Sequence, residues 1–113
     1  MKVKDVREKF NLDIAAGSKG LDREVKGGYC GDLLSDVMAN TGNGDIWFTV
    51  QAHQNILAVA VLKELAGIII VNGHKPDEET TKKANDEGIP ILTTGSTAYR
   101  MAGELFSLGI GKE

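Results

Sequence analysis

Short apolar runs alternate along this chain with segments in which apolar residues recur every three or four positions. The first pattern, rich in β-branched residues, is typical of strands, and the second is typical of amphipathic helices. Each apolar run stops at a cluster of small or polar residues, where a turn is expected. The pattern predicts strands at 12–15, 25–30, 46–50, 68–71 and 91–92.

Five helical segments flank or separate these strands. The first, on which Val3, Val6 and Phe10 share a face, ends near Asn11. Because strands and helices alternate with short connections, the sequence predicts the α/β class. We expect a three-layer α/β/α sandwich with a mostly parallel sheet of about five strands, in which 46–50 is central. The other helices are 33–38 with Asp32 as N-cap, 54–66 ended by Gly67, 76–87 ended by Gly88, and a last helix from Ser96 or Thr97 to Gly109.

The length and charge of the chain narrow the class of protein. Its 113 residues, 42% of them hydrophobic, fit one domain spanning 1–113. The net charge is -3, and the basic residues are scattered among acidic ones, which argues against nucleic acid as a partner. No apolar run approaches the roughly 20 residues that cross a bilayer, and the charged start is unlike a signal peptide. We therefore expect no membrane partner and a cytoplasmic location.

Catalytic signatures are missing from the sequence. It contains no G-x-x-x-x-G-K-[ST] phosphate loop, no G-x-G-x-x-G dinucleotide fingerprint and no G-x-S-x-G nucleophile elbow. The single cysteine, Cys30, excludes an internal disulfide and a cysteine-rich metal cage, and it is expected to be a buried thiol that acts as a small hydrophobe. The sequence predicts a protein that is not an enzyme and has no cofactor or metal.

Candidate binding residues gather where the apolar runs end. In parallel sheets, ligands bind in the crevice outside the carboxyl ends of the strands. Exposed amides and hydroxyls before the last helix favour a small anionic ligand or nucleotide there, with the junction after 68–71 alongside. The candidate ligand-binding residues are Asp32, His53, Asn72, Gly73, His74, Thr94, Gly95 and Ser96.

The same residues also have a purely structural interpretation. Gly95 and Ser96 fit an ordinary helix cap, and Asp32 fits an N-cap. His53 and His74 fit solvent-exposed or capping residues, although two histidines that face one another across the sheet edge would suit a metal or a general base.

The apolar pattern of the segment 54–66 bears on whether the protein binds a partner chain. Its apolar residues cover nearly the whole circumference of a helix, whereas a helix on one face of a sheet buries only about half of it. Either other helices of the domain cover the remaining apolar surface, or it lies in an interface, for which a homodimer is the default assembly. The apolar residues are Ile56, Leu57, Val59, Ala60, Val61, Leu62, Leu65 and Ala66.

Over 20–110 the chain resembles the DRTGG domain family, which is named for a short motif. The matching segments are GLDREVKGG at 20–28, GDLLSDVM at 31–38, AGIII at 66–70, PDEE at 76–79 and GIPIL at 88–92. Glu24 replaces the threonine of the name motif, and the glycine pair is displaced to Gly27 and Gly28. No ligand contact by that threonine is therefore carried over, and the glycine pair predicts a close backbone approach or a bulge.

The resemblance implies a regulatory role. Such domains resemble the N-terminal domain of HPr kinase/phosphorylase, occur beside CBS domains in regulated pyrophosphatases, and include stand-alone hydrogenase-associated proteins. HPr kinase transfers phosphate in a separate phosphate-loop domain, so no kinase activity is implied here. We expect a non-catalytic regulatory or ligand-sensing module. The alternatives are a protein-interaction adaptor without a small ligand, and a small enzyme that uses His53 and His74.

Overall fold

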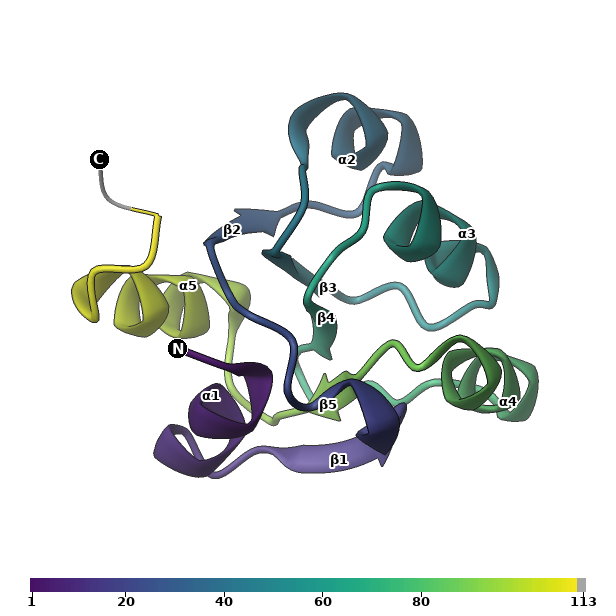
Figure 1. Ribbon diagram of the computed structural model, residues 1–113, viewed down its shortest axis with the longest axis horizontal. Helices are drawn as coiled ribbons and strands as arrows, with labels where there is room; N and C mark the ends of the chain where they lie inside the picture. The colour runs from purple at the N-terminus through teal and green to yellow at the C-terminus, as the bar shows by residue number, and fades with distance from the viewer. Residues whose placement is uncertain (112–113) are drawn as a thin grey trace.

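The computed structural model describes residues 1–111, which form a five-stranded sheet with helices on both faces (Figure 1). The strand order is β1-β5-β4-β3-β2, in which β2 to β5 run parallel and β1 runs antiparallel to β5. The strands are β1 (Asp13–Ala16), β2 (Gly27–Cys30), β3 (Asp45–Thr49), β4 (Gly67–Ile70) and β5 (Ile91–Thr93). The helices are α1 (Val3–Lys9), α2 (Leu34–Asn40), α3 (Asn55–Leu62), α4 (Glu78–Glu87) and α5 (Ala98–Ser107), with a 3-10 turn at Ser18–Gly20.

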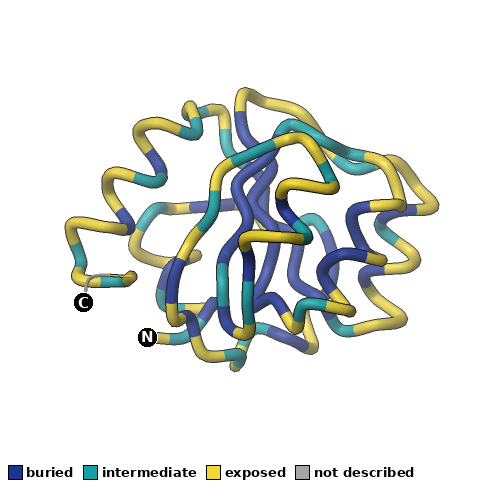
Figure 2. Tube along the Cα trace, turned by 90° about the horizontal axis from the view of Figure 1, so that it is seen from above, coloured by how far each residue is buried: buried dark blue, intermediate teal, exposed yellow. Residues whose placement is uncertain are grey.

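Each face of the sheet has its own hydrophobic core. On one face α2, α3 and α4 pack over Trp47 and Ile68, and on the other α1 and α5 pack over Phe48 and Ile69. The buried strands therefore run through the middle of the molecule, between helices whose outer surfaces are exposed (Figure 2). This arrangement confirms the three-layer sandwich and the mostly parallel sheet.

The middle position of the sheet belongs to β4 rather than to the predicted central strand. All four residues of β4 are buried, which is the pattern of a parallel strand covered on both faces. The predicted central strand, β3, lies beside it with a neighbour on each side. The apolar character of 46–50 identified an interior strand correctly, but burial on two faces does not distinguish the middle strand from the one next to it.

The third helix is shorter than its apolar pattern predicts. It ends at Leu62, with Lys63 as C-cap, and Glu64 turns the chain in the left-handed region at φ 54°. Leu65 and Ala66 then lead into β4 and are fully buried or nearly so, at 0% and 2% exposure. The predicted helix 54–66 was therefore too long, because the apolar residues after the turn belong to the approach to the sheet.

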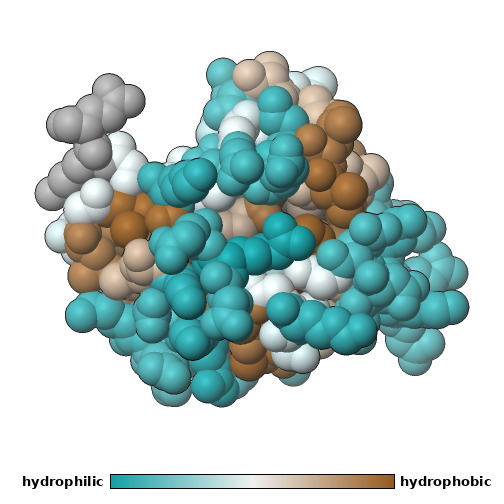
Figure 3. Space-filling view, viewed as in Figure 1, coloured by the Kyte–Doolittle hydropathy of each residue, from teal (hydrophilic) through white to brown (hydrophobic). Residues whose placement is uncertain are grey.

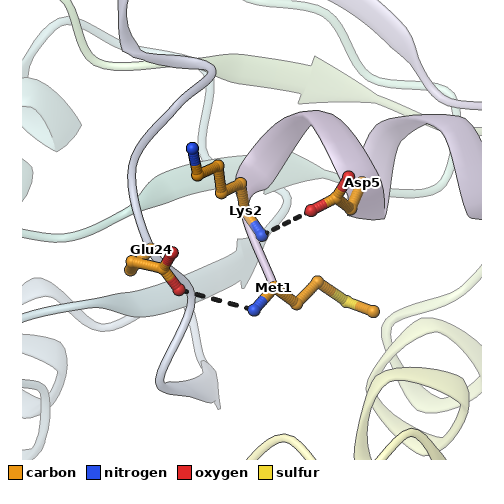
Figure 4. Close-up of polar contacts among 4 residues, drawn as sticks. All are labelled: Met1, Lys2, Asp5 and Glu24. Atoms are coloured by element: carbon orange, nitrogen blue, oxygen red, sulfur yellow. Dashed lines mark hydrogen bonds and ion pairs between the residues drawn. The ribbon is translucent and has the colours of Figure 1, made fainter.

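The segment with the family's name motif holds the N-terminus against the sheet. The Val3 N–H donates to the Arg23 carbonyl, the Lys4 N–H to the Leu21 carbonyl, and the Val25 N–H to the Met1 carbonyl. The Met1 ammonium lies 3.4 Å from the Glu24 carboxylate (Figure 4). These contacts give the residues around Arg23 a structural role at the amino ends of the strands.

Figure 4 also shows how α1 begins. The Asp5 carboxylate accepts a 2.8 Å hydrogen bond from the Lys2 backbone N–H, one of the groups left without a partner at a helix start. Gly27, in the same region, is buried against Asp45, and a Cβ there would lie 2.6 Å from the Asp45 carboxylate. The close contact at Gly27 is therefore with a side chain and not with backbone, and at Gly28 a Cβ would find ordinary contact distances from 3.4 Å. The β2–β3 register is regular and contains no bulge, so neither feature predicted for the glycine pair is found.

The start of α4 is capped by an ionised side chain. The Asp77 carboxylate accepts hydrogen bonds from the Thr80 hydroxyl at 2.6 Å and the Thr80 N–H at 2.8 Å. These bonds, the hydroxyl's first, hold the pKa of Asp77 below its ordinary value of 3.8, and nearby His53 contributes in the same direction. Gly88 ends the helix in the left-handed conformation, as the sequence predicted.

This cap makes a pH-dependent contribution to stability. Because the pKa of Asp77 is lower in the folded state, its contribution is present above the unfolded pKa and is lost as the pH falls through the folded pKa. Asp77→Asn keeps a capping oxygen without its titration. In urea titrations, the excess stability of the unmodified protein over Asp77→Asn should shrink as the pH falls from about 6 to about 2. An excess that does not change with pH would contradict this role.

Candidate functional site

The chain changes face once at the carboxyl edge of the parallel strands. After β2, β3 and β4 it continues into helices on one face, but after β5 it enters α5 on the opposite face. The loops after β4 and β5, which are neighbouring strands, therefore diverge. In open α/β sheets such a divergence opens the crevice in which ligands bind. The fold thus places a candidate site between these two loops, and we call this site the crevice.

Backbone hydrogen bonds join the two loops at the base of the crevice. The Asn72 N–H donates to the Ser96 carbonyl and the Gly73 N–H donates to the Thr94 carbonyl, both at 2.9 Å. Asn72 and Gly73 adopt left-handed conformations, at φ 59° and 77°, which turn the loop after β4 toward its neighbour. The structure therefore brings together six of the predicted residues, namely Asn72, Gly73, His74, Thr94, Gly95 and Ser96.

Two adjoining chambers form the crevice. The smaller, about 90 Å³, is lined by Gly73, His74 and Gly95 among others. The larger, about 260 Å³, extends along the α4 side between β1 and the start of α4, past Pro76 and Thr81. Both chambers are lined by the same three further residues, Asp13, Lys75 and Thr93.

Sequence reasoning missed those three shared residues. Lys75 follows His74 directly, so its position after β4 was a usable signal. Thr93 was missed because the apolar pattern ended the last strand at Leu92, one residue before β5 ends. Asp13 lies opposite Thr93 because β1 pairs with β5, a register that the sequence pattern does not reveal.

The backbone at the start of α5 is less available than the sequence suggested. The Ser96 N–H donates to the Thr94 hydroxyl at 3.1 Å, and the Arg100 N–H to the Thr97 hydroxyl at 3.2 Å. Thr97, not Ser96, is the N-cap. At Gly95, by contrast, a Cβ would meet no atom within 4 Å, so this residue faces open space.

Asp32 lies away from the crevice and does not cap a helix. Its carboxylate accepts hydrogen bonds from the Thr49 hydroxyl at 2.7 Å and the Val50 N–H at 2.9 Å, and the Gln51 side chain donates to its carbonyl. The N-cap of α2 is Leu33, without a side-chain hydrogen bond. The predicted cap was wrong, because the Asp32 carboxylate binds the end of β3 instead and so fixes the β2–α2 loop.

The two histidines are not joined to each other or to a nucleophile. His53 and His74 follow β3 and β4, are exposed, and make no side-chain hydrogen bond within residues 1–111. In the same residues, no three His, Cys, Asp or Glu side chains gather closely enough to hold a metal ion. His74 lines the smaller chamber, whereas His53 lies near Asp77 at the start of α4.

A second, larger hollow of about 590 Å³ lies between β2 and α5. Its walls include Phe48, Ala102 and Leu105, with Tyr99 and Phe106 at its exposed side. Figure 3 shows apolar surface over α5, and further apolar surface over α2 and α3. We call this hollow the apolar groove, since it contains no charged lining residue among those described.

Cys30 also lines the apolar groove, where it is exposed, so the prediction of a buried thiol was wrong. Partial burial, and to a lesser degree the charge of Asp32, raises the pKa of the Cys30 thiol. The thiol is therefore mostly protonated at neutral pH, and it is a poor nucleophile, because the thiolate is the reactive form.

None of the helices within residues 1–111 has the length and apolar character to span a membrane.

A family model for the DRTGG domain matches residues 11–108. The chain belongs to the DRTGG domain family. The predicted resemblance is confirmed, and the match includes β1, which the resemblance over 20–110 left out. The residues of the name motif lie at the amino ends of the strands, so in this DRTGG domain they are at the edge of the sheet opposite the crevice.

A solved structure with the same fold contains a DRTGG domain within a larger protein. It is the crystal structure of the CBS and DRTGG domains of the regulatory region of the Clostridium perfringens pyrophosphatase, complexed with an activator, diadenosine tetraphosphate. The TM-score is 0.73 at 15% sequence identity, with 90% of this chain and 44% of that chain covered. This chain therefore spans less than half of that regulatory region. No curated protein matches the sequence.

Proposed function

We propose that this DRTGG domain, as a single module spanning 1–113, is a non-catalytic regulatory domain that binds a small anionic metabolite or nucleotide in the crevice. The observation that carries the proposal is the divergence of the β4 and β5 loops to opposite faces, which opens a polar hollow at this edge of the sheet. The clostridial regulatory region, which contains a DRTGG domain and was solved with a nucleotide activator, supports a sensing role.

Thermal unfolding with candidate ligands tests this proposal. A ligand that binds only the folded state raises its stability by about 2.7 kcal/mol at a concentration of 100 times Kd. We expect one or more nucleotides or phosphorylated metabolites to raise Tm, and Gly95→Val to abolish the rise. The Gly95 Cβ position faces open space and its φ is not in the left-handed region, so valine occupies the crevice without backbone strain. If no anionic compound raises Tm, the proposal is wrong.

The non-enzymatic character rests on how the candidate catalytic groups are separated. A general base must lie within hydrogen-bond reach of the proton that it removes. His74 reaches the smaller chamber, but His53, Asp32 and Cys30 line neither chamber, and the pKa of Cys30 favours the unreactive thiol. These positions support binding without a catalytic step.

The apolar groove favours one second candidate function, that of a protein-interaction adaptor. Its exposed aromatic residues, Tyr99 and Phe106, are of the type that dominates binding energy in protein interfaces. This alternative predicts a partner protein on the α5 side and no effect of small anions on Tm.

We further propose that the protein is a homodimer through α3. Within this helix Val61 and Leu62 are 41% and 67% exposed, and Leu33, beside α2, is 68% exposed. Figure 3 shows apolar surface over α2 and α3, the two helices that these residues belong to or adjoin. Shared apolar surface of this kind on a small domain favours self-association.

A further inference from the structure

Three side chains that line the crevice have no polar partner among residues 1–111. Asp13 and Lys75 carry opposite charges and line both chambers, yet they form no ion pair. Thr93 is only 9% exposed, and its hydroxyl makes no hydrogen bond within these residues. No buried side-chain oxygen or nitrogen within these residues lacks a partner, so the unbonded Thr93 hydroxyl is open to the crevice, where a ligand can reach it.

The sheet orients two of these groups toward the same space. Thr93 is two residues beyond Ile91, which packs in the core on the α4 side, so the Thr93 side chain also faces α4. Asp13 is directly opposite Thr93 in the β1–β5 ladder, and directly opposite residues project from the same face. Lys75 reaches the same space from the loop between β4 and α4.

The two chambers differ in size and chemistry. The smaller one has glycines at Gly73 and Gly95, where a Cβ would meet nothing within 4 Å, so the backbone leaves room for a compact group. The larger one has apolar walls from Ile14, Ala15 and Pro76. A compact anion beside Lys75 suits the first chamber, and a larger, partly apolar group suits the second.

We propose that the crevice binds a nucleoside 5′-monophosphate, with the phosphate in the smaller chamber and the nucleoside in the larger. Lys75 pairs with the phosphate, and the Thr93 hydroxyl donates to it. Asp13, at the junction of the chambers, accepts hydrogen bonds from the ribose hydroxyls, the role that a carboxylate takes in dinucleotide-binding folds. This assignment rests on the proposed function and adds the ligand class and the residues that recognise it.

Calorimetric titration with AMP, 2′-deoxy-AMP, adenosine and inorganic phosphate tests the assignment. We expect AMP to bind the unmodified protein more tightly than the other three. Lys75→Ala should lower the affinity for AMP at least about tenfold, since a charge-assisted bond to the phosphate is lost, and should leave the affinity for adenosine unchanged. Lys83→Ala, an exposed lysine on α4 outside both chambers, is the matched control and should have no effect.

Two further variants separate recognition from folding. Thr93→Val removes a hydroxyl without a protein partner, so Tm should not fall while AMP affinity does. Asp13→Ala should abolish the preference for AMP over 2′-deoxy-AMP, because that preference depends on the ribose hydroxyl.

The possible failures are distinguishable. If AMP binds and Gly95→Val blocks it, but Lys75→Ala and Thr93→Val leave its affinity unchanged, the assignment is wrong and the proposed function stands. If inorganic phosphate binds as tightly as AMP in a way that depends on Lys75, the nucleoside part of the ligand class is wrong. If neither these compounds nor any other anion binds, both proposals fail.

Discussion

Gly17→Ala is expected to destabilise the protein by more than about 3 kcal/mol, within the range of mutations that strain a special backbone position. Gly17 has φ 72°, in the left-handed region, and a Cβ there would lie 1.9 Å from the Ile89 carbonyl oxygen and 2.8 Å from Pro90 Cα. The left-handed conformation alone costs alanine about 1–2 kcal/mol, and the clash is with backbone atoms that cannot rotate away. For a domain of roughly 100 residues, Tm should fall by more than about 12 °C.

The same substitution at Gly103 is the matched control. Gly103 lies within α5, where a Cβ would meet nothing within 4 Å. Alanine in a helix is more stable than glycine by about 0.5–1 kcal/mol, so Gly103→Ala should raise Tm. Thermal and urea unfolding of both variants provide the measurement. A Gly17→Ala protein that unfolds near the unmodified Tm would show that the Gly17–Ile89 contact is not as close as described.

Leu62→Glu is expected to convert the proposed dimer to a monomer. Leu62 is 67% exposed within one chain, so the glutamate leaves the fold of that chain intact. In an interface through α3, however, the carboxylate is buried without a partner, which costs about 3–5 kcal/mol. Since about 1.4 kcal/mol is a factor of ten, the dissociation constant should rise by more than about two orders of magnitude. Light scattering at micromolar concentration measures the mass.

Tyr99→Glu controls for the charge change on another face. Tyr99 is 91% exposed on α5, which covers the opposite side of the sheet from α3. The mass of the Tyr99→Glu protein in solution should remain that of the unmodified protein. Dissociation by Tyr99→Glu with no effect of Leu62→Glu would place the interface at the apolar groove. A monomeric unmodified protein would rule out the dimer.

The layers of the fold were predictable because each strand is marked by its own local pattern. The β-branched run at 68–71 predicted a strand, and the acidic residues Asp77, Glu78 and Glu79 predicted the start of a helix. Both elements lie near their predicted bounds. Two features depend on distant contacts and were beyond local patterns. One is the antiparallel pairing of β1 with β5, and the other is the turn at Glu64 that ends α3 early.

The candidate site, like the fold, was predictable only where it follows from local sequence patterns. Residues after β4 and β5 were grouped because the carboxyl ends of parallel strands lie at one edge of a sheet. The hydrogen bond between the Gly73 N–H and the Thr94 carbonyl shows that these two loops meet. Asp13 lines the crevice only because the β1–β5 register places it opposite Thr93. Asp32 does not line the crevice, because the Thr49 hydroxyl and the Val50 N–H bind its carboxylate elsewhere. Both outcomes depend on three-dimensional partners that a spacing argument does not include.

The helix α5 connects the crevice loop to the apolar groove, although none of its own residues lines the crevice. Its first residues follow the Gly95 loop of the crevice, and its body, with Tyr99 and Phe106, forms a wall of the apolar groove. If a ligand in the proposed crevice favoured one position of α5, it would change the affinity of the groove for a protein partner. Thermodynamic linkage requires the converse by the same factor, so a protein bound at the groove would tune the sensitivity of the crevice to its ligand.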